Sequence, residues 1–550
     1  MKAGHVQNED GSNYNLDNNT TKDVEPQKIF TEIDKNLDFL KYKYNALICN
    51  DVIIREFSLL AQNIEYKAFV MYIDGMVDSS VINEFILSPL MMRNRANIFD
   101  DKQKKFVSEK KIDNVTLKNF KKSKEKNLVD FIYNSLIPQN SVDKVTDFSD
   151  VYSAINMGNC MLFVDSLDTA FNLDVKGFKQ RNIDSPRNEV VVRGSQEAFV
   201  ENIRTNTSMI RRLVNNENLV METLTVGQIT KTQVSIGYIK SLANEDLVAE
   251  VRYRINNLSV DYLISSGQLE QLIQDSPESL FPQMVATERP DKVSNFLLEG
   301  RVVIVINGSP YVLVAPGVFV DFITSPEDLN LKYQFSNMQK LIRLLAIFLS
   351  LLLPGMYIAI TNYHQELIPT ELLFTIAAAR ESVPFPTFVE ILLMEISFEL
   401  IREAGLRVPT PLGSTIGIVG ALILGEAAVS ASLVSPVLII IIAITGICSF
   451  SIPDFSLNFT FRIYRFIYII LGYVAGFLGI SVVLFIQLVI MCKLKSFGSP
   501  YINPYILNKN KRSISSYFIP PIWKRERTSV FLHAQKKFSQ KKISMVWRKK

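Results

Sequence analysis

The chain has 550 residues, 48% of them hydrophobic, and a formal net charge of +4, so it has room for about three structural units. Its four cysteines (Cys49, Cys160, Cys448 and Cys492) fall in no CxxC or other ligand spacing, and it has only three histidines, which argues against a disulfide framework and a metal site. The soluble parts contain no GxGxxG, GxxxxGK[ST] or GxSxG pattern and no nucleophile–base set, so we expect no cofactor, and an enzyme is the least favoured class.

The N-terminal part is predicted to be soluble. Residues 1–30 are rich in Asn, Asp and Thr and lack an apolar signal-peptide region, so we expect a disordered tail, and a cytoplasmic location for the domains that follow. Residues 31–175 are expected to form a first α/β subdomain, in which the Lys-rich stretch 102–126 is a solvated loop rather than a nucleic-acid surface, because it lacks interleaved aromatic residues. Its expected elements are strands at 66–73 and 159–165 and helices at 79–92 and 127–137.

A polar linker at 176–188 is expected to lead into a second α/β subdomain at 189–335, because strand-like and helical stretches alternate there. Its expected elements are an amphipathic helix at 197–214 and strands at 232–239, 257–264, 301–308 and 311–316, the last two joined by a hairpin turn at 307–310. Several charged residues fit no catalytic spacing, and we expect them to form turns and subunit contacts. They are Arg193, Glu288, Arg289, Asp291, Glu299 and Arg301.

Residues 338–495 are expected to form an all-α polytopic membrane domain. The clear apolar spans are 338–360, 412–429, 433–450 and 466–492. Two further stretches, 367–380 and 387–404, are separated by Pro384 and Pro386 and either re-enter or cross, so four and six crossings both remain open. In the first span, Pro354 and Gly355 form either a gating hinge or a packing feature. Loops are marked by Arg380, Arg402, Arg407, Arg462 and Arg465.

A row of carboxylates lies inside this apolar region. Glu395, Glu399 and Glu403 recur every four residues and share one helix face, and Glu390 precedes them. A carboxylate at the bilayer centre costs about 3 kcal/mol, so the row must face protein, water or a cation. With Glu426, which lies within the span 412–429, these residues are candidates for an ion pathway.

Two structural readings of the same carboxylates stay open. The first is local salt bridging, for example between Glu399 and Arg402 or between Glu403 and Arg407. The second concerns Glu390, which follows the Pro384–Pro386 break by one turn and would suit the positive N-terminus of a helix.

The C-terminal tail, 496–550, is strongly basic. From Lys509 to Lys550 there are thirteen Lys and Arg residues and one acid, Glu526. Such a tail is typical of the cytoplasmic side of a membrane and of contact with anionic lipid, although a solvated tail fits equally well.

Several long stretches resemble the spore germination receptor A-subunit family, the GerA type, in collinear order from about Glu189 to Tyr505. They include EVVVRGSQEAFVENIRTNTSMIRR (189–212), FPQMVATERPDKVSNFLLEGRVVIVINGSPYVLVAP (281–316), YHQELIPTELLFTIAAARESVPFPTFVEILLMEISFELIREAGLRVP (363–409) and KSFGSPYINPY (495–505). The resemblance implies a nutrient (germinant) receptor subunit in the inner membrane of a bacterial endospore, which triggers germination.

The resemblance also implies an assembly. Its A subunits form a homo-oligomer with a cation conduit, beside a transporter-like B subunit that binds the germinant and a C-subunit lipoprotein. Two other classes stay open: an ion-coupled secondary transporter, although the membrane part shows no internal repeat, and a scaffold that positions the other subunits without conducting.

Overall fold

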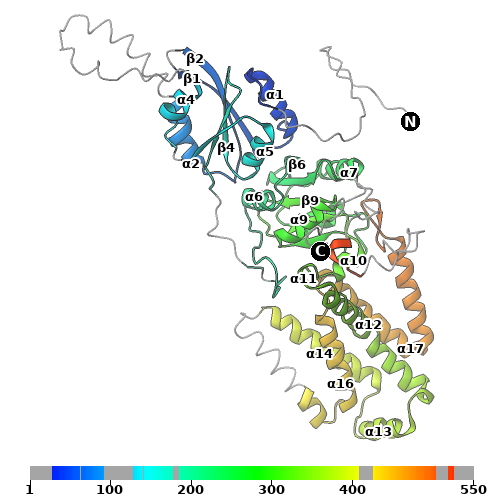
Figure 1. Cartoon of the computed structure of the whole chain (residues 1–550). Helices are drawn as coiled ribbons and strands as arrows, with labels where there is room; N and C mark the ends of the chain where they lie inside the picture. The colour runs from blue at the N-terminus through cyan, green and yellow to red at the C-terminus, as the bar shows by residue number, and fades with distance from the viewer. Residues whose placement is uncertain are drawn as a thin grey trace, which may run out of the picture. The chain divides into compact units, whose positions relative to one another are not determined.

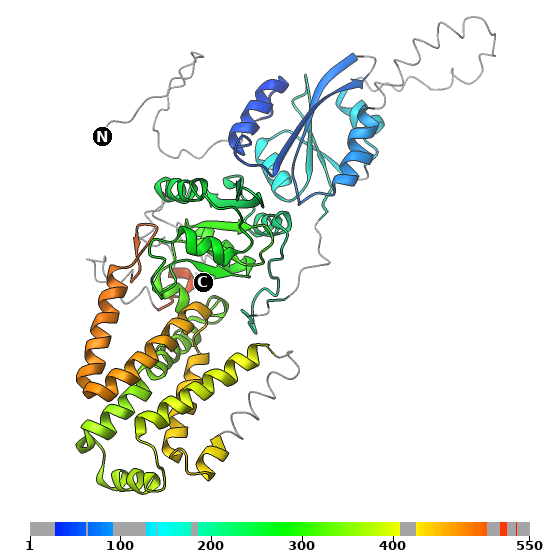
Figure 2. The same cartoon turned by 180° about the vertical axis from the view of Figure 1, so that it is seen from behind.

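The computed structural model describes residues 28–61, 64–91, 128–139, 141–177, 185–186, 188–407, 425–502, 518–524 and 535 (Figures 1 and 2). Several predicted features lie wholly or largely outside these residues. They are the tail 1–30, the Lys-rich stretch 102–126, the linker 176–188, the span 412–429 and the basic tail. The chain divides into two compact units, and residues 40–53 and 74–76 group with the second.

The first unit contains a five-stranded sheet in the order β1-β2-β4-β5-β3. The strands are β1 (Val52–Ala61), β2 (Ile64–Ile73), β3 (Val142–Val145), β4 (Cys160–Val164) and β5 (Ala170–Leu173). The helices are α1 (Ile33–Lys43), α2 (Ser79–Val81) continued by the π-helical η1 (Ile82–Leu87), α4 (Leu128–Phe131) continued by η2 (Ile132–Leu136), and α5 (Phe148–Asn156). Helices α1 and α5 lie on one side of the sheet and α2 and α4 on the other (Figures 1 and 2). Both predicted strands and both predicted helical regions are confirmed.

The second unit contains an antiparallel sheet in the order β6-β7-β9-β10-β8. Its strands are β6 (Leu219–Val226), β7 (Thr232–Ile239), β8 (Val285–Thr287), β9 (Val302–Ile306) and β10 (Val312–Ala315). The helices are α6 (Ile203–Leu213), α7 (Glu245–Asn256), α8 (Ser266–Ile273), α9 (Pro290–Leu298), α10 (Phe319–Ile323) and α11 (Glu327–Asn330). The strands predicted at 232–239, 301–308 and 311–316 and the turn joining the last two are confirmed.

Two predictions in this subdomain are wrong. Residues 257–264 form no strand, because their backbone bonds to the β6–β7 turn instead, with Gln228 N donating to Val260 O at 3.0 Å and Ile229 N to Asp261 O at 2.8 Å. The helix predicted from residue 197 begins at Ile203, because the Asn202 side chain accepts from the first-turn amides and caps the helix there.

The C-terminal part is helical. It contains α12 (Tyr333–Tyr363), η3 (Gln365–Leu367), α13 (Thr370–Arg380), α14 (Thr387–Arg407), α16 (Pro436–Phe450), α17 (Phe455–Lys493), the two-stranded β11 (Lys495–Ser496) and β12 (Ser499–Pro500), and η5 (Ile522–Lys524). Among the described residues, two helices are long and apolar enough to cross a membrane, α12 and α17. The predicted span 433–450 corresponds to α16, which has only 15 residues. Gly476, with φ of +59°, divides α17 into two arms (Figures 1 and 2).

Hydrogen bonds connect the two long helices, α12 and α17, to the subdomain that contains the second sheet. Near the start of α12, Arg343 donates to Ile323 O at 2.7 Å and to Asp328 Oδ2 at 2.9 Å. Near the start of α17, the Thr460 hydroxyl donates to Leu280 O. The subdomain, α12 and both arms of α17 share one packed core.

Candidate functional site

Helix α14 positions the predicted carboxylate row. It starts just after Pro386, whose carbonyl accepts from Val389 N at 2.9 Å, so the proline break predicted between 380 and 387 is confirmed. Its Glu390 and Glu395 are fully buried, Glu399 is half-buried, and Glu403 is exposed. The row therefore does not present one uniform surface, because burial decreases along the helix.

Glu395 is held by an arginine from α17. Its Oε2 accepts from Arg465 Nη1 at 2.9 Å, and the two side chains are 0% and 1% exposed. Arg465 also donates to Ser350 O at 2.9 Å and to the Ser350 hydroxyl at 3.1 Å on α12. This buried pair thus ties together α12, α14 and α17, and breaking it by removing one partner would be strongly destabilising.

Glu399 has two arginine neighbours. Arg462 of α17 forms a two-pronged contact with its carboxylate, and Arg402, one turn along α14, lies 3.4 Å away. Arg402 also donates to the Ser449 hydroxyl of α16 at 3.0 Å. The carboxylates of Glu395 and Glu399 are therefore charge-compensated by side chains on α14 and α17.

Glu390 is less completely paired. Its Oε2 accepts from Ser435 N, at the start of α16, at 3.0 Å, and Arg380 of α13 lies 3.6 Å from its other oxygen. That separation is too long for a hydrogen bond. Arg380 therefore balances part of the Glu390 charge but leaves the second carboxylate oxygen without a hydrogen bond. Glu390 does not cap its own helix through these contacts, because they reach to α13 and α16.

Buried polar atoms gather around Glu390 without a hydrogen-bond partner among the described residues. They are Glu390 Oε1, Thr387 Oγ1, Arg380 Nε and the hydroxyls of Tyr357 and Ser435. Thr387 lies one turn before Glu390 on the same helix face, and Tyr357 belongs to the same buried cluster as the neighbouring Ile391 and Val434. Buried polar groups are normally satisfied, so this cluster has the chemistry of a hydrated or ion-accepting spot.

The remaining predicted positions in the helical part lie apart from this cluster. Glu403 and Glu426 are exposed. Pro354 and Gly355 lie within α12, and a Cβ at Gly355 would meet Tyr468 O at 2.8 Å, while one at Gly472 would meet Gly355 O at 2.8 Å. The structure therefore gives Gly355 a close-packing role against α17, and the gating-hinge role stays a prediction.

The prediction that arginines mark loops is wrong for three of the five. Arg402 lies in α14, and Arg462 and Arg465 lie in α17, where each bonds to a carboxylate or a hydroxyl of another helix. A signal was present in the sequence: an arginine in an apolar region needs an acidic partner, and Glu395 and Glu399 are the acids available.

The charged residues singled out in the second subdomain have partners within the chain. Arg289 is fully buried and donates to Asp291, to Glu189 O at 3.0 Å and to Ser195 O at 2.9 Å. Glu288 accepts from the amides of Asn188 and Glu189 at 2.7 and 2.9 Å.

Arg301 is also buried. It bonds both oxygens of Asp321 and contacts Glu299, and the balance of these charges against burial raises its pKa. Arg193 is exposed. Subunit contact stays a prediction for these residues, while their observed role is to hold the segment 188–195 and the start of α10.

No group of three or more His, Cys, Asp or Glu side chains that could hold a metal occurs among the described residues. The arrangement in the helical part offers charge, hydroxyls and buried polar atoms, which suit ion or water binding better than bond-making chemistry.

Comparison with known proteins identifies the relatives of this chain. A family model described as "Bacillus/Clostridium GerA spore germination protein" matches residues 38–530. Spore germination protein KA of Bacillus subtilis (strain 168) is 37% identical over 517 residues, which are 94% of this chain and 90% of the relative. Spore germination protein GerLA of Bacillus cereus is 34% identical over 455 residues, 83% of this chain and 87% of the relative.

A solved structure is also similar. It is the crystal structure of the N-terminal domain of the A subunit of the Bacillus megaterium spore germinant receptor GerK3, which is 29% identical, covers 54% of this chain and 99% of its own length, and has a TM-score of 0.37.

Proposed function

This chain belongs to the Bacillus/Clostridium GerA spore germination protein family, and from that premise we propose that it is the A subunit of a germinant receptor that contributes to a cation conduit. A role in spore germination is supported by relatives that are themselves named spore germination proteins. The conduit is supported by one observation above all, the cluster of unsatisfied buried polar atoms around Glu390.

The cluster supports a conduit for a physical reason. Polar groups buried in an apolar helical region are costly unless water, an ion or another polar group satisfies them. Glu390 brings a negative charge, which Arg380 at 3.6 Å balances only in part. Thr387, Ser435 and Tyr357 bring hydroxyl oxygens, the kind of ligands that hard cations prefer. In a homo-oligomer, each such cluster would repeat around the axis.

The receptor assembly is part of the same proposal. The chain would lie in the spore inner membrane as a multi-pass protein, with a transporter-like B subunit that binds the germinant and a C-subunit lipoprotein as partners. We expect no enzymatic activity of its own. The N-terminal domains and the basic tail would be cytoplasmic together.

A contact of the C-terminal tail supports the proposal that the tail and the N-terminal domains lie on the same side of the membrane. Ile519 N donates to Asn337 Oδ1 at 2.8 Å, and Asn337 Nδ2 donates to Ile519 O at 3.2 Å. Asn337 lies in the first turns of α12, next to the second subdomain, so this part of the tail returns to the soluble end of the helices.

The experiment compares Glu390→Gln with wild type in spores, measuring subunit abundance and cation release in the same sample. The substitution preserves shape and can still accept from Ser435 N, but it removes the charge. We expect normal abundance with slower or less selective cation release. Normal abundance with normal release would contradict the conduit role of Glu390.

A non-conducting scaffold is the second candidate, and the arginine pairs of Glu395 and Glu399 favour it. A carboxylate paired with an arginine links two helices and leaves little negative potential to attract a cation. A scaffold predicts that Glu390→Gln leaves release unchanged, whereas loss of the Glu395–Arg465 pair lowers receptor abundance.

A further inference from the structure

The Arg380 side chain lies where a mobile cation would have to bind in the cluster around Glu390. Arg380 Nε is 3.6 Å from Glu390 Oε1, and this oxygen belongs to a fully buried side chain and has no hydrogen-bond partner among the described residues. The Tyr357 hydroxyl lies within electrostatic range of both charges and close to the Ser435 hydroxyl. The guanidinium is therefore already placed beside the oxygen that a mobile cation would need.

This contact differs from the tight pair on the same helix. Arg465 is 1% exposed and donates to Glu395 and to the carbonyl and hydroxyl of Ser350. Arg380 is 28% exposed, its Nε is too far from Glu390 for a hydrogen bond, and that Nε has no other partner among the described residues. The side chain of Arg380 is therefore held weakly in a place where a charge is costly.

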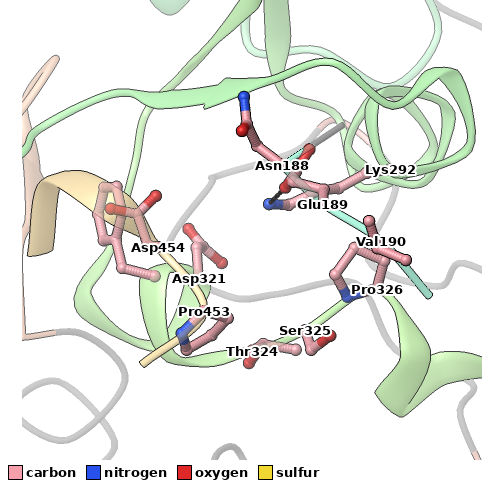
Figure 3. Close-up of a pocket in the computed structure, with 11 residues that line it drawn as sticks. Asn188, Glu189, Val190, Lys292, Asp321, Thr324, Ser325, Pro326, Pro453 and Asp454 are labelled. Carbon is pink, nitrogen blue, oxygen red and sulfur yellow. Dashed lines mark hydrogen bonds and ion pairs between the residues drawn. The ribbon is translucent and has the colours of Figure 1, made fainter. Parts of the chain in front are cut away.

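Charged groups around the polar cavity in the second subdomain are held more closely. Figure 3 shows Lys292 of that cavity, whose Nζ lies 2.7 Å from Glu189 Oε1. Asp321, in the same wall, accepts from Arg301 through both of its oxygens. Direct bonds of this kind fix a charge in place, whereas the longer separation at Glu390 leaves the guanidinium to be displaced by a small movement.

The helix that carries Arg380 is weakly anchored. Arg380 is the last residue of α13, and only Ile376 of that helix is buried. No residue of α13 belongs to the buried hydrophobic clusters formed by the described parts of α12, α14, α16 and α17. The residues that follow, 381–386, are mostly exposed. A displacement of α13 would therefore carry the guanidinium away from Glu390 without disturbing the packed core.

We propose that the Arg380 guanidinium is a tethered cation that occupies the Glu390 site while the receptor is closed, and that conduction requires it to withdraw. This inference rests on the conduit proposed above. With Arg380 in place, a mobile cation that approaches Glu390 meets a like charge in surroundings of low dielectric constant. Once the guanidinium leaves, the carboxylate and the neighbouring hydroxyls are free to bind the cation.

The test measures potassium leak before any nutrient is added. The full-length subunit, alone and with the proposed B and C subunits, is reconstituted into phosphatidylethanolamine–phosphatidylglycerol vesicles loaded with potassium, and efflux is followed with an ion-selective electrode. Arg380→Gln removes the charge and retains hydrogen-bond donors, whereas Arg380→Lys retains the charge. Lys493→Gln is the matched control, because it also removes one positive charge, from an exposed position at the end of α17.

We expect Arg380→Gln to leak about tenfold faster than wild type at equal incorporation, because the like charge no longer blocks the site. Arg380→Lys and Lys493→Gln should leak no faster than wild type. Adding Glu390→Gln to Arg380→Gln should lower the leak severalfold, because the carboxylate that attracts the cation is then gone. In Glu390→Gln alone, the Arg380 charge is no longer balanced and repels cations, which agrees with the slower release expected above.

Efflux from Arg380→Gln vesicles no faster than from wild type would overturn the proposal. So would equal leaks from Arg380→Gln and Arg380→Lys, or a leak that Glu390→Gln leaves unchanged, since that leak would come from damaged packing rather than from this site. If Arg380→Gln does not leak while Glu390→Gln still slows release in spores, the tethered cation is excluded and the conduit stands. Release in spores that is insensitive to Glu390→Gln would contradict the conduit, and this inference with it.

Discussion

Replacing Glu395 by leucine should destabilise the helical part far more than the similar volume of the two side chains suggests. Arg465 is 1% exposed and would lose its carboxylate partner while keeping only its bonds to Ser350. Removing one member of a buried ion pair typically costs about 3–5 kcal/mol. Because whole domains are stable by only about 5–15 kcal/mol, we expect Glu395→Leu to reduce the amount of subunit in the membrane severalfold.

The double variant separates charge loss from cavity effects. In Glu395→Leu/Arg465→Met both partners become apolar at similar volume, a change that is often neutral or stabilising for buried pairs. We therefore expect abundance and the midpoint of thermal unfolding to recover toward wild type. Glu403→Gln is the control, because Glu403 lies on the same helix but is exposed.

The assay is membrane abundance by immunoblot together with thermal unfolding of the purified, full-length subunit. The reasoning would be refuted if Glu395→Leu matched wild type in both measurements. It would equally be refuted if the double variant were no better than the single one, because the pair would then make no coupled contribution.

Three further outcomes are expected. Gly472→Ala should lower the free energy of unfolding by about 1–3 kcal/mol, because the new Cβ would lie 2.8 Å from Gly355 O. Gly405→Ala is the control and should not lower it, because nothing lies within 4 Å of a Cβ at that position. Equal unfolding midpoints for the two variants would contradict this. Burial, with a smaller contribution from the charge of Asp454, raises the pKa of Glu270 from 4.5 to about 7. The folded state therefore holds this proton more tightly than the unfolded state, and the free energy of unfolding should fall as the pH rises from 4.5 to about 7. Glu270→Gln should reduce that slope in denaturant titrations at pH 5 and pH 8, and an unchanged slope would count against it. A peptide of residues 509–550 should co-sediment with anionic vesicles, at about 1 kcal/mol per Lys or Arg near the surface, and equal binding to neutral vesicles would exclude an electrostatic mechanism.

The parts of the fold that sequence reasoning predicted are those fixed by local pattern. Strand β7 (Thr232–Ile239) and the β9–β10 hairpin follow from apolar strand patterns and a good turn, and α14 follows from its proline boundary. Residues 257–264 show the limit of this reasoning. They have strand-forming residues, but their backbone partners are in a turn, so Tyr262 and Ile264 stay exposed.

The candidate site was predictable only in part, for a similar reason. Glutamate spacing placed Glu395 and Glu399 on one helix face, but their arginine partners come from α17, 70 and 63 residues away in the sequence. The spacing of charges within one helix cannot show which residues of another helix lie opposite. The buried polar cluster around Glu390 likewise needs α12, α13, α14 and α16 to be placed together.

Cation flux through the reconstituted chain tests the central proposal most directly. The full-length subunit would be placed in vesicles loaded with potassium, alone and together with the proposed B and C subunits, and release of potassium would be followed after germinant addition. The conduit account predicts germinant-dependent release with the complete receptor, and a lower rate or weaker cation selectivity with Glu390→Gln at equal subunit incorporation. Fully assembled receptor that binds germinant but releases no cation, or the same release from Glu390→Gln as from wild type, would contradict it.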